Sequence, residues 1–214
     1  MKTYLSSVYS YKLSYKWWRL SRARRKSIIS GISTKLNQLK KRPEVKKAEF
    51  YTSLRHDSDL IFWIMSAENY AAVEFRAYAE KLLDDNASIR YGLISLYKEN
   101  PSQTAKKSNT VFFVAYPVKK SADWYALSKA DRSEIMAEHI NVATSNPHSR
   151  GIVSYTTHSF GLDDSDFVVI YELPSLLGWV ETVELLRGVR ARKWIIKEDP
   201  VIVGSNAKFD SLLY

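Results

Sequence analysis

The segment WWRLSRARRKSII, residues 17–29, returns as WYALSKADRSEIM at residues 124–136, a shift of 107 that is half of the 214-residue chain. Six of the thirteen aligned positions are identical, and the same shift, without a gap, places Asp57-Ser58-Asp59 on Asp164-Ser165-Asp166. Two separate blocks in one register indicate an internal duplication. We therefore expect a common scaffold in both halves, and chemistry where one half departs from the other.

Each half is predicted to run strand, helix, strand, strand, helix, strand. In the second half, periodicity and turn residues predict strands at 111–117, 152–158, 167–172 and 193–197, and helices at about 128–143 and 174–186. In the first half they predict an apolar-striped helix carrying Ile28 to Leu39, strands at 49–54 and 60–65, and a helix at 71–83. A polar, proline-bearing linker, residues 98–103, lies between the halves.

The order βαββαβ is the ferredoxin-like plan, in which helices cover one face of an antiparallel sheet. Two copies leave two bare sheet faces, and packing these faces together makes an α+β barrel of the dimeric alpha-beta barrel type. The predicted fold is thus α+β, with one ferredoxin-like repeat at residues 1–100 and a second at residues 108–214.

Composition narrows the class of protein. The chain is 45% hydrophobic, which is ample for a core, but no apolar run approaches the roughly 18–20 residues of a membrane-spanning helix. The first residues lack the apolar stretch of a signal peptide, so we expect a cytoplasmic location. There is no cysteine, which excludes disulfides, thiolate metal sites and a cysteine nucleophile.

The net charge of +9 is unevenly distributed. Between Lys12 and Lys47 there are thirteen lysines and arginines but one acid, Glu44, so this segment alone carries +12. One interpretation is an anionic partner, such as nucleic acid, a lipid surface or a polycarboxylate ligand. The other is a solvated helix face.

Among the four histidines, only His139 lies on an apolar helical stripe, together with Ile135, Met136 and Val142. Its repeat partner is Ile32, so a core position in one copy is a potential ligand in the other. A satisfied core histidine is the alternative. The repeat partner of His158 is Tyr51, which indicates an ordinary packing position for His158.

Motifs for other functions are missing from the sequence. It contains no GxSxG, P-loop or GxGxxG motif, and no closely spaced histidine pair, which argues against hydrolase, nucleotide-binding and zinc sites. The aromatic strand pattern of an RNA-recognition module is missing too, so nucleic-acid binding is disfavoured.

Several motifs resemble the chlorite dismutase-like family, which includes chlorite dismutases and coproheme decarboxylases. They are FVAYPVKK from Phe113, DWYALS from Asp123, MAEH ending at His139 and SFGLDDSDF from Ser159, with RHDSDLIFW from Arg55 in the first half. The YPxxK, xEH and FGLDD elements come in the family's order and spacing, and the resemblance covers nearly the whole chain. It implies the barrel fold described above.

The resemblance also implies roles for residues of the second half. His139 would be the axial ligand and metal-binding residue of a haem b or coproheme iron, while the first half would hold no haem. Tyr116 would form the radical that oxidises a propionate, with hydrogen peroxide as oxidant, and Lys120 would lie near the propionates. Trp124 and Ser154 would lie around the cofactor, although Trp124 is mainly structural because Trp17 repeats it.

Two positions depart from the family pattern. Ser154 stands where chlorite dismutases have a distal arginine, with Arg150 as a nearby substitute, and Tyr116 favours decarboxylation over chlorite chemistry. Arg190 stands where the family supplies an acid that accepts a hydrogen bond from the axial histidine. A cation there would repel the imidazole and its iron, so haem would bind weakly or be absent, unless Glu184 or a backbone carbonyl accepts instead.

The sequence therefore predicts a peroxide-dependent coproheme decarboxylase, assembled as a homo-oligomer for which the family suggests a pentamer. The alternative is a non-catalytic member without haem that acts as a binding or structural protein. Chlorite dismutase is less favoured, followed by nucleic-acid binding.

Overall fold

The computed structural model describes residues 2–99, 109–206 and 212. The first half contains strand β1 (Thr3–Leu13), helices α1 (Tyr15–Arg19) and α2 (Arg22–Lys40), strands β2 (Val45–Ser53) and β3 (Leu60–Ser66), helix α3 (Tyr70–Leu83) and strand β4 (Ala87–Lys98), with a 3-10 turn at Asp84–Asn86. Residues 100–103 of the predicted linker lie outside the described residues.

The second half repeats this order. It contains strand β5 (Phe112–Lys120), helices α4 (Ala122–Ala126) and α5 (Lys129–Ser145), strands β6 (Val153–His158) and β7 (Phe167–Leu173), helix α6 (Leu176–Leu186) and strands β8 (Ile195–Lys197) and β9 (Ile202–Ser205). Short 3-10 turns lie at Pro147–Ser149 and Arg190–Trp194.

Strand pairing confirms the duplication residue by residue. β1 and β3 pair from Leu5↔Ser66 to Tyr11↔Leu60, and β5 and β7 pair from Phe112↔Leu173 to Val118↔Phe167, the same register moved by 107. The cap residues agree as well, because Ser21 and Ser128 each accept a hydrogen bond from the third residue of α2 or α5.

One expected correspondence is wrong by one position. Tyr51 pairs with Ile61 in the first half, and the partner of the equivalent Val168 is Thr157, not His158. β2 and β6 are therefore related by a shift of 106, and the structural counterpart of His158 is Thr52. His158 has its ring against Phe160 and Phe167 near the end of β6.

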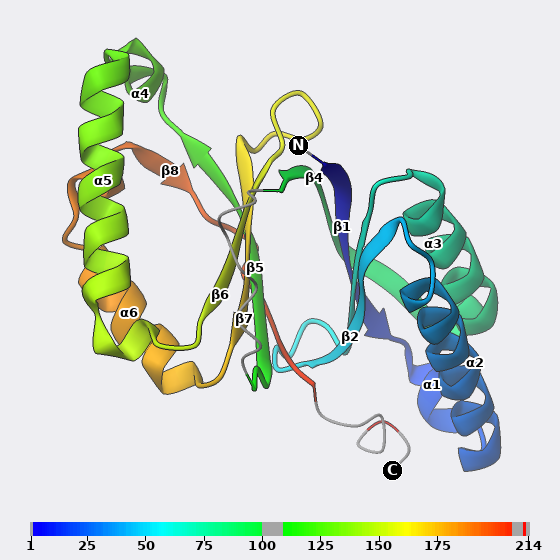
Figure 1. Cartoon of the computed structure of the whole chain (residues 1–214). Helices are drawn as coiled ribbons and strands as arrows, with labels where there is room; N and C mark the ends of the chain where they lie inside the picture. Colours follow the sequence, from blue (N-terminus) through cyan, green and yellow to red (C-terminus); the bar gives the residue numbers. More distant parts are fainter. Residues whose placement is uncertain (1, 100–108, 207–211, 213–214) are drawn as a thin grey trace.

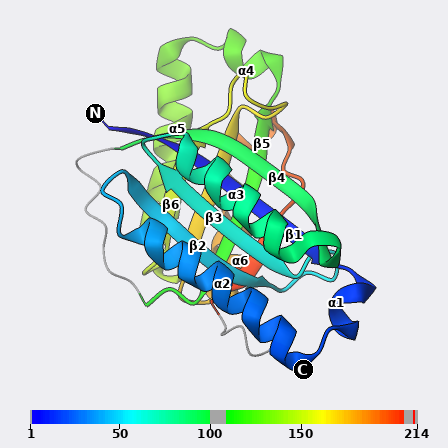
Figure 2. The ribbon, with the colours of Figure 1, turned by 90° about the vertical axis from the view of Figure 1, so that its right-hand side faces the viewer.

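The strands close into a barrel in the order β7-β6-β4-β1-β3-β2-β9-β5, and β5 pairs back to β7. Helices α1–α3 cover one outer side and α4–α6 the opposite side (Figures 1 and 2). The seams between halves are short: Leu96↔His158 joins β4 to β6, and two residue pairs join β2 to β9. This is the predicted α+β barrel of two ferredoxin-like repeats.

The last strand differs from its prediction. It begins at Ile195 rather than residue 193, and after an interruption it continues as β9, which pairs with both β2 and β5. Gly204 is required at this seam, because a Cβ there would lie 2.8 Å from the side chain of Ile61 and 3.0 Å from the carbonyl oxygen of Thr52. Sequence periodicity misses β9 because four residues are too few to establish a pattern.

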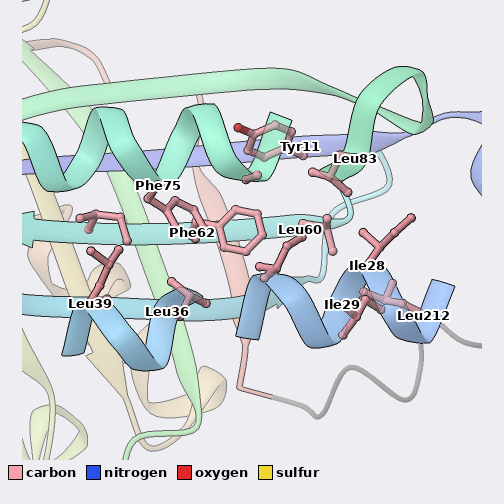
Figure 3. Close-up of a cluster of buried hydrophobic side chains, with 14 of the residues drawn as sticks. Tyr11, Ile28, Ile29, Leu36, Leu39, Leu60, Phe62, Phe75, Leu83 and Leu212 are labelled. Carbon is pink, nitrogen blue, oxygen red and sulfur yellow. The ribbon is translucent and has the colours of Figure 1, made fainter. Parts of the chain in front are cut away.

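Two large apolar clusters form the core. One fills the space between α2, α3 and the first-half strands, with Ile32, Leu39, Phe62 and Phe75 all at most 1% exposed (Figure 3). The other fills the barrel interior with aromatic side chains from both halves, including Trp63, Phe113 and Tyr155. Among the described residues, no helix is long and apolar enough to cross a membrane.

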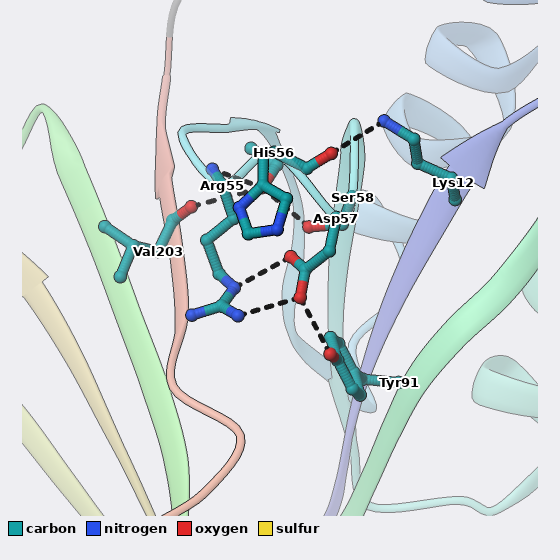
Figure 4. A network of polar contacts seen from close by, with 8 residues as sticks. Lys12, Arg55, His56, Asp57, Ser58, Tyr91 and Val203 are labelled. Atoms are coloured by element: carbon teal, nitrogen blue, oxygen red, sulfur yellow. Dashed lines mark hydrogen bonds and ion pairs between the residues drawn. The ribbon is translucent and has the colours of Figure 1, made fainter.

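The duplicated Asp-Ser-Asp segment is part of the scaffold. Asp59 accepts a hydrogen bond from the backbone N–H of Leu13 at 2.7 Å, and Asp166 accepts one from Lys120, the counterpart of Leu13, at the same distance. Asp57 binds both Arg55 and the Tyr91 hydroxyl (Figure 4). These carboxylates fix the turn against the neighbouring strands, which explains why the segment occurs in both halves.

Candidate functional site

The helix-facing side of the second-half sheet is partly exposed, whereas its counterpart in the first half is filled. Ser154 and Thr156 of β6 are exposed, and Val169 of β7 is half-buried. Strand pairing makes their counterparts Ala48, Phe50 and Phe62, all of which belong to the first-half core or pack against it. We call Ser154, Thr156, Val169 and the neighbouring Tyr116 and Tyr171 the open face.

The helix over this face makes few apolar contacts. α2 buries six side chains, whereas the fully described α5 buries one, Ile135. The small apolar cluster around α5 is formed by Trp124, Ile135, Val189 and Ala191, and none of these four lies on a strand. Helix and sheet in the second half are therefore not joined by a continuous core.

His139 lies on α5 and is half-buried. Burial lowers the pKa of its imidazole, and the positive charge of Lys120 lowers it further. The neutral ring is the form that ligates metals. Within the described ranges no group of three histidine or acidic side chains could hold a metal ion.

Lys120 is close enough for its charge to act on His139, and Trp124 lies against Lys120. The Lys120 Nζ atom is 3.1 Å from the centroid of the Trp124 ring and 3.9 Å from Met136 Sδ. Desolvation lowers the pKa of Lys120 to about 8, with Asp166 opposing the change. A half-buried ammonium held by an aromatic face can bind a carboxylate of a ligand.

Tyr116 lies on the open face, within a row of aromatic rings. Its ring stacks on that of Tyr171, with 6.1 Å between the ring centroids. The ring of Tyr171 in turn packs on Trp179 of α6, with 4.4 Å between centroids. The two tyrosine hydroxyls share a hydrogen bond, and burial raises the pKa of both phenols. Sequence reasoning missed Tyr171 and Trp179; the pairing of β5 with β7 is what brings Tyr171 alongside Tyr116.

The remaining predicted positions fall in two places. Ser154 pairs across the sheet with Tyr171 and so belongs to the Tyr116 side of the site. Arg150 is exposed in the turn before β6. The predicted residues thus form two groups, His139 with Lys120 and Trp124, and Tyr116 with Ser154. Both groups lie on the side of the second-half sheet that α4–α6 cover.

Arg190 is bound by two acids of α5. Its guanidinium pairs with Glu134 at 2.8 Å and with Glu138, and its backbone N–H donates to Glu138 at 3.0 Å. The charge that lowers the pKa of His139 comes from Lys120, so the expected repulsion by Arg190 is offset by these carboxylates. Glu184 is exposed and lines a separate hollow with His148 and Glu181.

Comparison with known proteins adds an independent line of evidence. Residues 25–207 match the sequence model of a family described as chlorite dismutase. A coproheme decarboxylase from Mycolicibacterium smegmatis is 24% identical over 200 residues, which cover 88% of this chain and 85% of that protein. A chlorite dismutase from Ideonella dechloratans is 28% identical over 103 residues, which cover 48% of this chain and 35% of that protein.

Solved structures extend the similarity to the whole chain. A crystal structure provisionally described as a chlorite dismutase is 34% identical, with a TM-score of 0.88, and the match covers 100% of this chain and 98% of that one. A mutant chlorite dismutase from Candidatus Nitrospira defluvii is 20% identical, with a TM-score of 0.84 and coverage of 98% and 94%. The second similarity supports the fold alone.

Proposed function

This chain belongs to the chlorite dismutase family, and we propose that it binds an iron porphyrin and acts as a peroxide-dependent coproheme decarboxylase. The observation that carries the proposal is the open face, which lies under a helix bearing a half-buried histidine and contains the tyrosine of the YPxxK element. The similarity to a coproheme decarboxylase over most of the chain supports the choice of reaction.

The residues present fit such a group. His139 has a pKa lowered by burial, so its neutral imidazole is available as the axial ligand. At Thr156 and Val169 the open face carries smaller side chains than their counterparts Phe50 and Phe62, and we infer that a flat ligand takes up this difference. A bound ferric porphyrin, which could be coproheme or haem b, would supply the centre that reacts with hydrogen peroxide.

Four other residues of the proposed site would then have defined roles. The Lys120 ammonium would bind a propionate carboxylate by a charge-assisted hydrogen bond and orient it. Tyr116 would give up one electron, and its hydroxyl proton has an acceptor in Tyr171 Oη. Trp124 would hold Lys120 in place through its ring face. Ser154, a small exposed residue, would leave space beside Tyr171.

The overall reaction is balanced. One propionate side chain, one hydrogen peroxide and one proton become one vinyl group, one carbon dioxide and two waters. The side chain loses two electrons and the peroxide gains two. The carbon–carbon bond to the carboxylate breaks, and one hydrogen leaves the adjacent carbon chain.

Porphyrin binding is tested by titrating the protein with ferric coproheme and with ferric haem b, following the Soret band. We expect a saturable shift that is lost in His139→Ala and retained in the matched control His148→Ala, since His148 is exposed and paired with Glu181. An unchanged titration in His139→Ala would assign the ligand elsewhere.

Turnover is tested by adding peroxide to the loaded protein and measuring carbon dioxide and the mass of the porphyrin. Tyr116→Phe should keep the Soret titration and stop decarboxylation. The control is Tyr9→Phe, which makes the same change at the repeat partner in the first half. Release of carbon dioxide at the parent rate by Tyr116→Phe would show that Tyr116 is not the oxidised residue.

A second candidate is a family member that holds no haem and acts as a binding or structural protein. It is favoured by Arg190, which stands at the expected acid position and is bound to Glu134 and Glu138. Among the described residues, no carboxylate forms an ion pair with His139. A Soret titration without any shift would support this candidate.

We also propose, from the family resemblance, that the chain forms a homo-oligomer, and a pentamer in particular. Light scattering after size-exclusion chromatography measures the number of subunits directly.

A further inference from the structure

A basic corner of the molecule takes no part in the proposed site. Seven of the thirteen basic residues between Lys12 and Lys47 form ion pairs with acids elsewhere in the chain. About half of the positive charge of this segment is therefore neutralised in three dimensions. These seven are Lys12, Lys16, Lys35, Lys40, Arg42, Lys46 and Lys47.

The remaining charge is concentrated where α1 meets α2. Arg22, Arg24 and Lys26 are exposed, and in the part of the chain that the structure describes none of them forms an ion pair. Arg19 is exposed as well, with its guanidinium over the ring of Tyr15. Two aromatic side chains project beside these cations, Tyr15 at 65% and Trp18 at 49% exposure. We call these six residues the basic tip.

The scaffold does not require the basic tip. At the equivalent corner of the second half, the serine cap and the buried tryptophan are retained. Of the six outward-facing positions, however, four are changed, whereas Trp18 and Arg22 have the similar counterparts Tyr125 and Lys129. The counterparts of Tyr15, Arg19, Arg24 and Lys26 are Ala122, Ala126, Asp131 and Ser133.

Arg22 and Arg24 are also placed where they oppose helix stability, in the first turn of α2. The first turn of α2 contains no acid, whereas the first turn of α5 contains Asp131. Positive side chains at the positive end of a helix dipole destabilise the helix, so helix stability does not account for these two arginines.

We propose that the basic tip binds the anionic phospholipid surface of a membrane. Exposed tryptophan and tyrosine next to lysine and arginine are typical of groups that sit at the level of lipid headgroups. The four cations lie within eight residues that run from the end of α1 into the first turns of α2, so they can meet one flat surface together. Figure 1 shows α1 on the opposite side of the molecule from α5.

Nucleic acid fits the basic tip less well. Single-stranded nucleic acid binds by stacking its bases on free aromatic faces. Here Arg19 lies over Tyr15, and Arg25 lies over Trp18 with 5.9 Å to the ring centroid, so one face of each ring is already taken. The rings of Tyr15 and Trp18 could instead insert edge-first between lipid headgroups, which does not require a free ring face.

The experiment is sedimentation with vesicles of phosphatidylcholine alone and of equal parts phosphatidylcholine and phosphatidylglycerol. We expect binding to the anionic vesicles only, weakened by added salt. The variant Arg22→Ala, Arg24→Ala, Lys26→Ala should lose about a hundredfold in partitioning, since each basic residue contributes about 1 kcal/mol near such a surface.

The matched control Lys41→Ala, Lys81→Ala, Lys129→Ala removes the same charge from exposed positions away from the basic tip and should bind like the parent. Circular dichroism establishes that both variants fold. Equal binding by the two variants, or no binding to anionic vesicles, would overturn the proposal. So would displacement from vesicles by an oligonucleotide, or a change of oligomeric state in the tip variant. No porphyrin is present, so the outcome is independent of the proposed catalysis.

Discussion

The two halves share a backbone plan but not the layer between helices and sheet. Where the first half packs Leu13 and Ile32, the second half has Lys120 and His139. Where it packs Ala48 and Phe62, the second half has Ser154 and Val169. The strand register is the same in both. The comparison shows that the apolar side chains on the helix-facing side of a sheet can be replaced by polar or smaller ones without changing the pairing of the strands.

The difference extends to the deepest part of this layer. Leu39 and Phe75 are fully buried, and the same shift of 107 relates them to Asn146 and Thr182, which form a buried hydrogen bond of 3.1 Å. Each buried leucine or phenylalanine contributes about 1.5–3 kcal/mol. We infer that the first half carries most of the stability of the chain, while the second half carries the proposed site.

The largest difference between the halves, in both stability and porphyrin binding, is expected on substitution of Ile32 and its counterpart His139. Ile32→Ala should destabilise the fold by about 2–5 kcal/mol, because it opens a cavity in a filled core, and it should not affect porphyrin affinity. His139→Ala should cost less than about 1 kcal/mol and abolish porphyrin binding. Urea unfolding and Soret titration measure both. Equal losses of stability in the two variants would mean that the second half is packed like the first.

A second pair of variants tests what the halves have in common. Asp59→Ala and Asp166→Ala each remove a charged acceptor from a backbone N–H, and each should cost about 1.5–3 kcal/mol in urea unfolding. The exposed residue Glu68 serves as control, since Glu68→Ala should change stability by less than about 0.5 kcal/mol. A large effect in only one half would contradict a shared scaffold.

Refilling the open face should convert the second half towards the first. Thr156→Phe restores the aromatic residue of its counterpart Phe50 and should weaken ferric coproheme binding by about tenfold or more, through overlap with the ligand. Thr156→Val, which keeps the size of the side chain, should bind like the parent. Undiminished affinity in Thr156→Phe would place the ligand away from this face.

The smallest expected effect on stability comes from the ion pairs that Glu74 of α3 forms with Lys35 and Arg42. In the first half Glu74 bridges Lys35 and Arg42, which lower its pKa from 4.5 to about 2. A carboxylate with a lowered pKa stabilises the fold fully above its unfolded value, and this contribution is lost as the pH falls from about 4.5 to 2. Glu74→Gln should flatten this part of the stability curve in urea titrations. A curve as steep as the parent's would exclude Glu74 as its source.

Much of the fold could be predicted because the duplicated sequence carries the same structural signals in both halves. The serine caps, the apolar stripe of α2 and the contrast between Ile32 and His139 are all local or repeated signals, and the structure confirms the barrel they predict. The single-position shift between β2 and β6 could not be predicted, because a change of one residue in a loop is invisible without strand pairing.

The site could be predicted only in part. His139, Tyr116 and Lys120 follow from the duplication and the family motifs. Tyr171 and Trp179 could not be inferred, because their place beside Tyr116 depends on tertiary packing of β7 and α6. Likewise, only the structure reveals that Arg190 is bound to Glu138.

The position of β9 has a consequence for synthesis of the chain. β9 begins at Ile202 and covers the edge of β2, which ends at Ser53, so about 150 residues separate the two partners. At typical translation rates that interval is on the order of 10 s. During it the nascent first half presents an uncovered strand edge to other chains on the same messenger. A ribosome that stalls before residue 202 would therefore release a product prone to aggregation.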